Sequence, residues 1–186
     1  MLSHKGTMLL ETSRLVLRQA VPEDAAPMFR NWASDPEVTK YLTWPAHESI
    51  SVTEWVLGSW LQEYKKQNYY QWMIVLKEIG QPIGSISVVR LHENIEEAEI
   101  GYCIGKTWWH HGIVTEALGA VIDLLFREVG MNRVCARHDT NNPNSGAVMR
   151  KCGMQYEGTL RSADRNNQGI CDAAVYAILR SDWERF

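Results

Sequence analysis

Several features are scarce or missing in this sequence of 186 residues. No two of its four cysteines form a C-x-x-C pair, which argues against a zinc ribbon and a disulfide framework and fits a reducing compartment. No lysine or arginine cluster occurs and the formal net charge is -3, so we expect no nucleic-acid partner and no anionic membrane surface. No apolar run is long enough to span a bilayer, and the N-terminus lacks a basic stretch followed by an apolar core. These absences predict a soluble, cytoplasmic protein.

The two familiar phosphate loops are missing as well, since there are neither three spaced glycines nor a Gly-Lys pair before serine or threonine. A different glycine turn, at Gly112, follows the strand-like segment 98–104 and precedes an amphipathic helix that begins near Thr115. The first backbone N–H groups of a helix lack partners within it, and the helix dipole favours an anion there. The turn therefore predicts a main-chain site for phosphate or pyrophosphate. An ordinary strand, turn and helix without a ligand is the alternative.

Periodicity and turn residues predict a chain of mixed helices and strands. A capping box at Ser51-Val52-Thr53-Glu54 predicts a helix toward Tyr69, with Val52, Trp55, Val56 and Ser59 on one face. The other expected helices are 22–32, the one that ends at Gly130, and one that Asn142 caps and Gly153 closes. The expected strands are 15–19, 71–76, 83–91, 98–104, 133–138, 155–160 and 173–179. No repeat or linker divides the chain, so we expect one domain over residues 1–186, of α+β class, with a single mixed, mostly antiparallel sheet and helices on both faces.

Three segments, read together, resemble the GNAT superfamily of acetyl-CoA-dependent N-acetyltransferases: Ala98-Glu99-Ile100-Gly101-Tyr102, the turn at Gly112, and Asn142-Pro143-Asn144-Ser145. The segments 11–18 and 34–38 resemble the opening and the second marker of the RimJ/RimL-type group. This resemblance covers nearly the whole chain and implies the GNAT fold, acetyl-CoA as cosubstrate, no metal, and direct transfer to an amine. By analogy with relatives it also suggests a homodimer. The sequence departs from the family at Trp109, where Arg or Gln is usual, and at Val114, where Gly or Ala is usual.

The resemblance also implies roles for particular residues. Backbone N–H groups around His111, Gly112, Val114 and Thr115 would hold the coenzyme A pyrophosphate, and the predicted coenzyme site extends to Tyr102, Ile104, Asn142 and Ser145. Glu99 would lie beside the acceptor amine as the base. Ser145 would contact the thioester end and protonate or hydrogen-bond the leaving thiolate. The alternatives are an ion-paired or surface glutamate at Glu99 and a simple helix cap at Ser145. Because Asn142 already occupies the cap, Ser145 is expected to face the ligand.

Other residues offer weaker candidates. Tyr156 and Tyr176 are alternative proton donors, although burial in a strand also explains them. The pair His110-His111 has no third ligand at metal-binding spacing, so no metal site is expected. An aromatic block between residues 44 and 72 is expected to be mostly core, with one or two members at the acceptor site. The block comprises Trp44, Trp55, Trp60, Tyr64, Tyr69, Tyr70 and Trp72.

The acceptor is favoured to be a protein N-terminal α-amine. Its reference pKa is about 7.7 to 8.0 and that of lysine about 10.4, so neutralising them at pH 7 costs about 1 and about 4.6 kcal/mol. A small-molecule amine, such as a polyamine or an aminoglycoside, is the main competitor. Carboxylates at Glu93, Glu96, Glu97 and Glu99 could bind a polyamine if they converged. From other classes, a non-catalytic acyl-CoA-binding module and a purely structural protein remain alternatives.

Overall fold

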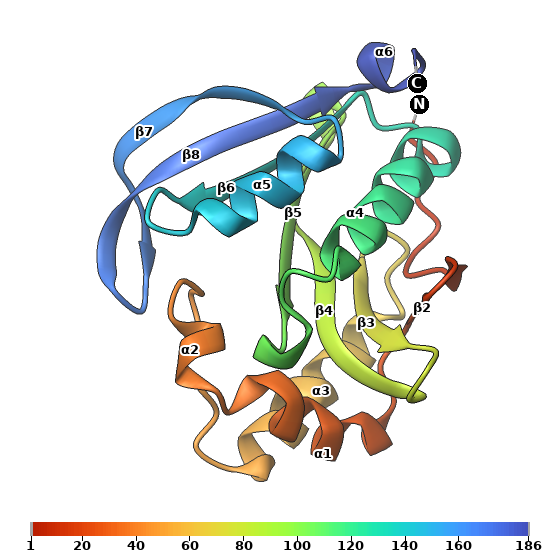
Figure 1. The fold of residues 1–186 in the computed structure, drawn as a ribbon. Coiled ribbons are helices and arrows are strands. Elements are labelled where there is room, and N and C mark those ends of the chain that lie inside the picture. Colours follow the sequence, from red (N-terminus) through yellow and green to blue (C-terminus); the bar gives the residue numbers. More distant parts are fainter. Residues whose placement is uncertain (1, 186) are drawn as a thin grey trace.

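An eight-stranded sheet runs through residues 2–185, the part of the chain that the computed structural model describes (Figure 1). The strand order is β1-β2-β3-β4-β5-β6-β8-β7, and all neighbours pair antiparallel except β5 and β6, which are parallel. The strands are β1 Leu10–Glu11, β2 Leu15–Arg18, β3 Gln71–Leu76, β4 Gln81–His92, β5 Glu97–Ile104, β6 Arg133–Asp139, β7 Gln155–Asn166 and β8 Gly169–Leu179. The predicted mixed, mostly antiparallel sheet is confirmed.

Helices cover both faces of this sheet. The α-helices are α1 Ala25–Met28, α2 Pro36–Thr39, α3 Ile50–Glu63, α4 Ile113–Leu124, α5 Pro143–Lys151 and α6 Arg180–Trp183. Short turns of other helix types are η1 Pro22–Asp24, η2 Phe29–Ala33, η3 Glu93–Ile95, η4 Lys106–Trp108 and η5 Leu125–Val129. In Figure 1, α4 and α5 lie on one side of the sheet, and α1 and α3 lie across the other side of its N-terminal half.

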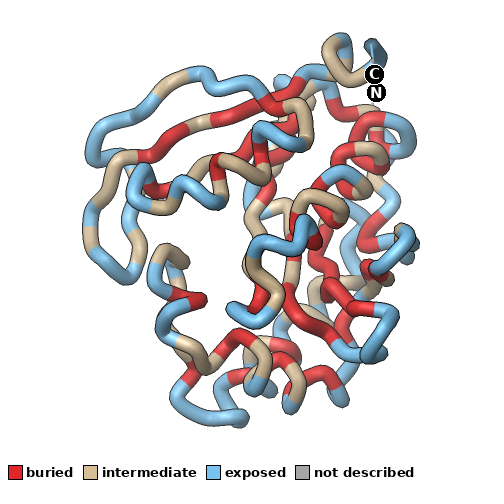
Figure 2. The backbone as a smooth tube through the Cα atoms, viewed as in Figure 1, coloured by how far each residue is buried: buried red, intermediate tan, exposed pale blue. Residues whose placement is uncertain are grey.

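Period-2 alternation along the strands divides the core in two. In β3, Trp72 and Ile74 pack into the cluster that contains α4 and Met149 of α5. Their neighbours Met73 and Val75 pack into the cluster around α1, η2 and α3. All six residues of β3 are therefore buried. Figure 2 shows buried residues both in the sheet and in the helices that pack on it.

The prediction for α3 was wrong in its start and in most of its buried face. The helix begins at Ile50 after Ser49, before the predicted capping box, and it ends at Glu63. Trp55 is 76% exposed, whereas Thr53 and Leu57 are the buried residues of this helix. The reason is tertiary: buried His47 contacts the Thr53 hydroxyl, with 2.7 Å between Nδ1 and Oγ1, and this contact turns Thr53 inward.

The parallel pair β5 and β6 separates soon after it forms. Only Glu97, Ala98 and Glu99 of β5 pair with β6, opposite residues 133–135. Beyond Glu99 the two strands diverge, and each leads into the start of a helix, α4 after β5 and α5 after β6. The opening between the diverging strands therefore lies beside two helix N-termini.

Candidate active site

A cavity of about 280 Å³ lies at the start of α4. We call it the helix cavity and define it by Tyr102, Ile104, Gly112, Val114, Thr115, Asn142 and Ser145, with Trp108, Trp109, Asn144 and Lys151 among the other residues that line it. Gly112 precedes the helix with φ +71°, a left-handed conformation that glycine adopts without strain. No side chain among residues 2–185 caps this helix, so its first N–H groups remain available to an anion.

The turn is held from outside by Glu116. Its carboxylate accepts hydrogen bonds from the Thr12 hydroxyl at 2.5 Å, the Ser13 hydroxyl at 3.0 Å and the Arg14 backbone N–H at 3.0 Å. Arg14 Nε also donates to it at 2.6 Å. Burial alone would raise the pKa of Glu116, but these hydrogen bonds lower it to about 2. A charged Glu116 thus ties the N-terminal strands to α4 without occupying the free N–H groups.

His111 behaves differently from its neighbours in the turn. Its backbone carbonyl accepts a hydrogen bond from Arg14 Nη1 at 2.8 Å, and the residue does not line the helix cavity. His110, with φ +64°, lines the helix cavity instead. Of the predicted coenzyme residues, the other seven all line the helix cavity, whereas His111 faces Arg14.

The two departures from the family pattern have structural explanations. The Trp109 indole Nε1 donates to the Ile104 carbonyl at 2.9 Å, which anchors the loop between β5 and α4. Val114 is 7% exposed and packs into the core beneath α4. Its side chain therefore does not cover the backbone N–H groups at the helix start.

A second cavity, of about 610 Å³, opens where β5 and β6 diverge. We call it the sheet cavity and define it by Ser85, Ser87, Glu99, Gly101, Arg137 and Asp164. Ser85 pairs with Cys103 and Ser87 with Gly101, so these side chains share one face of the sheet. Cys103 on that face packs toward the α1 and α3 core, whereas Tyr102 and Ile104 pack toward α4. The two cavities therefore lie on opposite faces and meet through the opening in the sheet.

Six residues line both cavities and mark their junction, namely Tyr41, Leu42, Tyr102, Cys103, Asn142 and Ser145. The Tyr102 hydroxyl donates to the Ser145 carbonyl at 3.0 Å and lies 3.0 Å from Ser145 Oγ. Burial raises the pKa of Tyr102, which keeps its phenol protonated. Asn142 occupies the N-cap position of α5 but makes no capping hydrogen bond with its side chain. The predicted Asn142 cap is therefore not formed, and both Asn142 and Ser145 face the junction.

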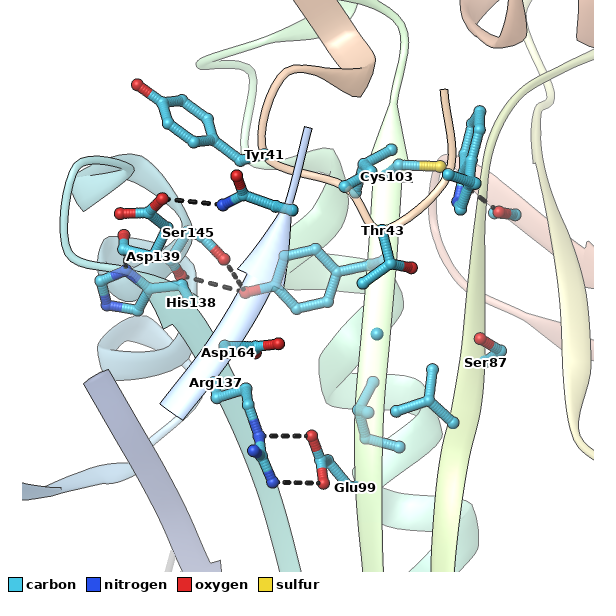
Figure 3. Close-up of a pocket in the computed structure, with 18 of the residues that line it drawn as sticks. Tyr41, Thr43, Ser87, Glu99, Cys103, Arg137, His138, Asp139, Ser145 and Asp164 are labelled. Atoms are coloured by element: carbon cyan, nitrogen blue, oxygen red, sulfur yellow. Dashed lines mark hydrogen bonds and ion pairs between the residues drawn. The ribbon is translucent and has the colours of Figure 1, made fainter. Parts of the chain in front are cut away.

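Glu99 lies in the sheet cavity as a paired carboxylate (Figure 3). Arg137 Nε lies 2.7 Å from Glu99 Oε1 and Arg137 Nη2 donates to Oε2 at 2.9 Å, an arrangement in which both oxygens are engaged. Arg90 Nη1 lies 3.5 Å from Oε2. The Glu99 side chain is only 8% exposed. The structure therefore contains the ion-paired alternative for Glu99, and the same side chain also lines the sheet cavity.

The weaker candidates lie elsewhere. Tyr176 is buried, and its hydroxyl accepts a hydrogen bond from Arg150 Nη1 at 3.0 Å. Tyr156 lies on the edge strand β7 and is 56% exposed. Neither tyrosine lines the helix cavity or the sheet cavity. Of the aromatic block, Trp44 and Trp60 line the sheet cavity. No group of three His, Cys, Asp or Glu side chains within residues 2–185 is arranged to hold a metal ion. No helix in the same range is long and apolar enough to cross a membrane.

Sequence reasoning missed Arg137, Asp164 and the partnership of Tyr102 with Ser145. Alternation along β5 could have separated Tyr102 from Glu99 onto different faces. Arg137 and Asp164 carry no local signal, because their positions depend on which strands pair with β6 and β8. They are visible only once the sheet is assembled.

Comparisons of sequence and of structure with known proteins point to the same class of protein. Residues 14–155 match a family model described as an acetyltransferase (GNAT) domain. The chain is 32% identical over 172 residues to the uncharacterized N-acetyltransferase YoaA of Bacillus subtilis (strain 168), covering 92% of this chain and 97% of that protein. It is 30% identical over 112 residues to the ribosomal-protein-serine acetyltransferase of Escherichia coli (strain K12), covering 60% and 62% of the two chains.

A solved structure of RimL, a ribosomal L7/L12 alpha-N-protein acetyltransferase in complex with coenzyme A, has the same fold. It matches with a TM-score of 0.82 at 19% identity, and the match covers 92% of this chain and 98% of that one.

Proposed function

The chain belongs to the GNAT acetyltransferase family, and from this premise we propose that it transfers acetyl from acetyl-CoA to the α-amine of a protein N-terminus. Its class is that of an N-acetyltransferase that uses acetyl-CoA as cosubstrate. The observation that carries the proposal is the junction of the two cavities at Tyr102, Asn142 and Ser145. A cosubstrate bound in one cavity and an amine bound in the other meet at this opening.

The helix cavity fits the diphosphate of coenzyme A. Uncapped N–H groups after Gly112 supply charge-assisted hydrogen bonds, and Lys151 adds a cationic side chain to the lining. These groups, with Tyr102, Ile104, Val114 and Thr115, make up the proposed coenzyme site. Acetyl-CoA supplies the thioester whose acetyl group the amine takes up.

Proton movements define what the side chains have to do. Transfer forms a C–N bond, breaks the C–S bond, and removes two protons from an amine that arrives as ammonium. One proton ends on the thiolate and the other in solvent. In the proposal, Ser145 and Tyr102 protonate the thiolate, supported by their hydrogen bond and by a raised Tyr102 pKa that keeps this proton available. A carboxylate of the sheet cavity receives the other proton, and the sequence predicts Glu99 for this part.

The charges of the sheet cavity favour an acceptor with one ammonium group over a polyamine. Of the four glutamates that could have converged on a polyamine, only Glu99 lines the cavity. The three carboxylates of the cavity, which include Asp139 and Asp164, are matched by the arginines Arg90, Arg137 and Arg165. Glu97 is instead paired with Arg133, with 2.5 Å between Oε2 and Nε. An α-amine also needs the weaker base, because its reference pKa is only about 8. The naming of one relative as a ribosomal-protein-serine acetyltransferase supports the same class of acceptor.

Release of free thiol from acetyl-CoA tests the proposal. We expect rapid release with a peptide that begins with serine, and none with the same peptide blocked at its N-terminus but carrying an internal lysine. Spermidine and kanamycin serve as the small-molecule acceptors. Faster turnover with either of them than with the free peptide would contradict the assignment of the acceptor and leave the family unchanged.

A further inference from the structure

Three carboxylates line the sheet cavity, and two of them are already bonded. Glu99 is engaged at both oxygens by Arg137. Asp139 accepts from the Asn141 backbone N–H at 2.8 Å and from Asn166 Nδ2 at 2.7 Å. Burial alone would raise the pKa of Asp139, but these bonds lower it below its ordinary value. Both carboxylates are therefore already bonded to neighbouring protein groups.

The third carboxylate, Asp164, is differently placed. It lies on β7, where the register with β8 shifts between Leu160 and Asp164, and it then pairs with Cys171. Within residues 2–185, the one hydrogen bond to its carboxylate comes from the Arg165 backbone N–H to Oδ1 at 2.8 Å. Its other oxygen, Oδ2, has no such partner. Asp164 is half-buried, and Figure 3 shows its carboxylate in the cavity between Arg137 and Ser145.

Charged side chains from several strands surround Asp164. Arg137 on β6 is the nearby cation. Burial lowers the pKa of its guanidinium, but the hydrogen bond and charge of Glu99 raise it above the ordinary value, and the charge of Asp164 adds to this rise. Glu99, Asp139 and Arg165 line the same cavity, and Cys171 with Asp172 lies on β8 beside it. Because Arg137 gives its Nε and Nη2 to Glu99, Asp164 is the cavity carboxylate with an oxygen available to a substrate.

We infer that Asp164 binds the acceptor ammonium and takes its proton, whereas Glu99 is a positioning residue that holds Arg137. The inference rests on the proposed function. A proton passes from the ammonium nitrogen to Asp164 Oδ2, directly or through one water, and the freed lone pair forms the C–N bond as the C–S bond breaks. The Tyr102–Ser145 pair protonates the thiolate and takes back the second proton, which the nitrogen loses as the amide forms. Asp164 returns its proton to solvent through the mouth of the cavity.

The test compares Asp164→Asn, Glu99→Gln and a control, Asp172→Asn. Asp172 lies on the same hairpin, lines neither cavity, and as asparagine keeps an oxygen for the Ser162 backbone N–H that it accepts at 2.8 Å. At pH 7 with a serine-terminal peptide, we expect kcat/KM to fall about 100-fold in Asp164→Asn, the loss typical of a general base. The control is expected to stay within about twofold of the wild type, since that is ordinary variation for a surface change.

The pH dependence separates a base from a structural residue. In Asp164→Asn the deficit is expected to shrink about tenfold between pH 7 and pH 9.5, because an α-amine of pKa about 8 is then mostly neutral in solution. In Glu99→Gln the deficit is expected to be the same at both pH values. A deficit in Asp164→Asn that does not change with pH would overturn the inference.

Binding provides a readout that needs no turnover. Titration of the peptide into the protein saturated with coenzyme A is expected to show about tenfold weaker binding in Asp164→Asn than in the control, a loss typical of one charge-assisted hydrogen bond. Unchanged binding together with unchanged kcat/KM in Asp164→Asn would assign the proton to another group and leave the proposed function intact. Wild-type protein that binds the peptide but releases no thiol would contradict the proposed function instead. Equal melting temperatures of the three variants exclude misfolding.

Discussion

The two cavities present different parts of the chain to a ligand: one mainly backbone, the other mainly charged side chains. The helix cavity offers main-chain N–H groups, a glycine turn and apolar walls, and the side chains of Trp109 and Val114 leave those N–H groups uncovered. The sheet cavity offers charged side chains in defined pairs, above all Glu99 with Arg137. A cosubstrate shared by a family can be held by backbone, which every sequence has. An acceptor that differs between members has to be recognised by side chains.

The largest effect is expected where this side-chain pairing is broken. Within residues 2–185, Arg137→Ala leaves the nearly buried Glu99 carboxylate with Arg90, at 3.5 Å, as its one remaining cation. We expect a loss of about 3 kcal/mol in the free energy of unfolding. Urea unfolding measures it. The matched change beside the helix cavity is Arg14→Ala. It is expected to cost about 1 kcal/mol or less, because Arg14 is 45% exposed and Glu116 keeps Thr12 and Ser13. Equal losses would erase the contrast between the two sides.

A second expectation concerns the junction, which belongs to both cavities. Tyr102→Phe and Ser145→Ala are each expected to lower kcat about 100-fold while acetyl-CoA affinity changes less than about tenfold. Because the two hydroxyls form one hydrogen-bonded unit, the double variant is expected to be about as slow as the slower single one. Thiol release and calorimetry measure these quantities. Tyr156→Phe, outside both cavities, is the control, and multiplicative losses in the double variant would show that the hydroxyls act separately.

Acid pH tests how much Glu116, beside the helix cavity, contributes to stability. The pKa of Glu116 is lowered to about 2 from an ordinary 4.5, so its contribution to stability is complete above pH 4.5 and disappears as the pH falls toward 2. We expect Glu116→Gln to be less stable than the wild type at pH 6, by on the order of 2 kcal/mol, and to match it near pH 2. Urea unfolding at several pH values tests this. A constant difference across that range would mean that Glu116 acts through packing alone.

Sequence patterns were informative where local rules decide the structure. The strand at 71–76, the glycine turn at Gly112 and the end of the helical run at Gly130, with φ +92°, were predicted from periodicity and turn chemistry. The same rules failed for the buried face of α3, because Thr53 is turned inward by its contact with His47, a residue outside the helix. The arginine that pairs with the predicted Glu99 could not be predicted from the sequence either. Arg137 meets Glu99 only because β5 and β6 pair in parallel for three residues, a register that no local pattern encodes.

The smallest effect is expected at Gly112, and it tests whether the backbone conformation binds the cosubstrate. A Cβ at this position would meet nothing closer than Arg14 Nη2 at 3.8 Å, so alanine is disfavoured only by the φ of +71°. That conformation costs an alanine about 1 kcal/mol, and we expect about fivefold weaker acetyl-CoA binding in Gly112→Ala. Asparagine tolerates left-handed backbone better, so Gly112→Asn is expected to lie between alanine and the wild type. If Gly112→Asn bound more weakly than Gly112→Ala, side-chain bulk rather than backbone conformation would control this cavity, and the two sides of the site would differ less than their chemistry indicates.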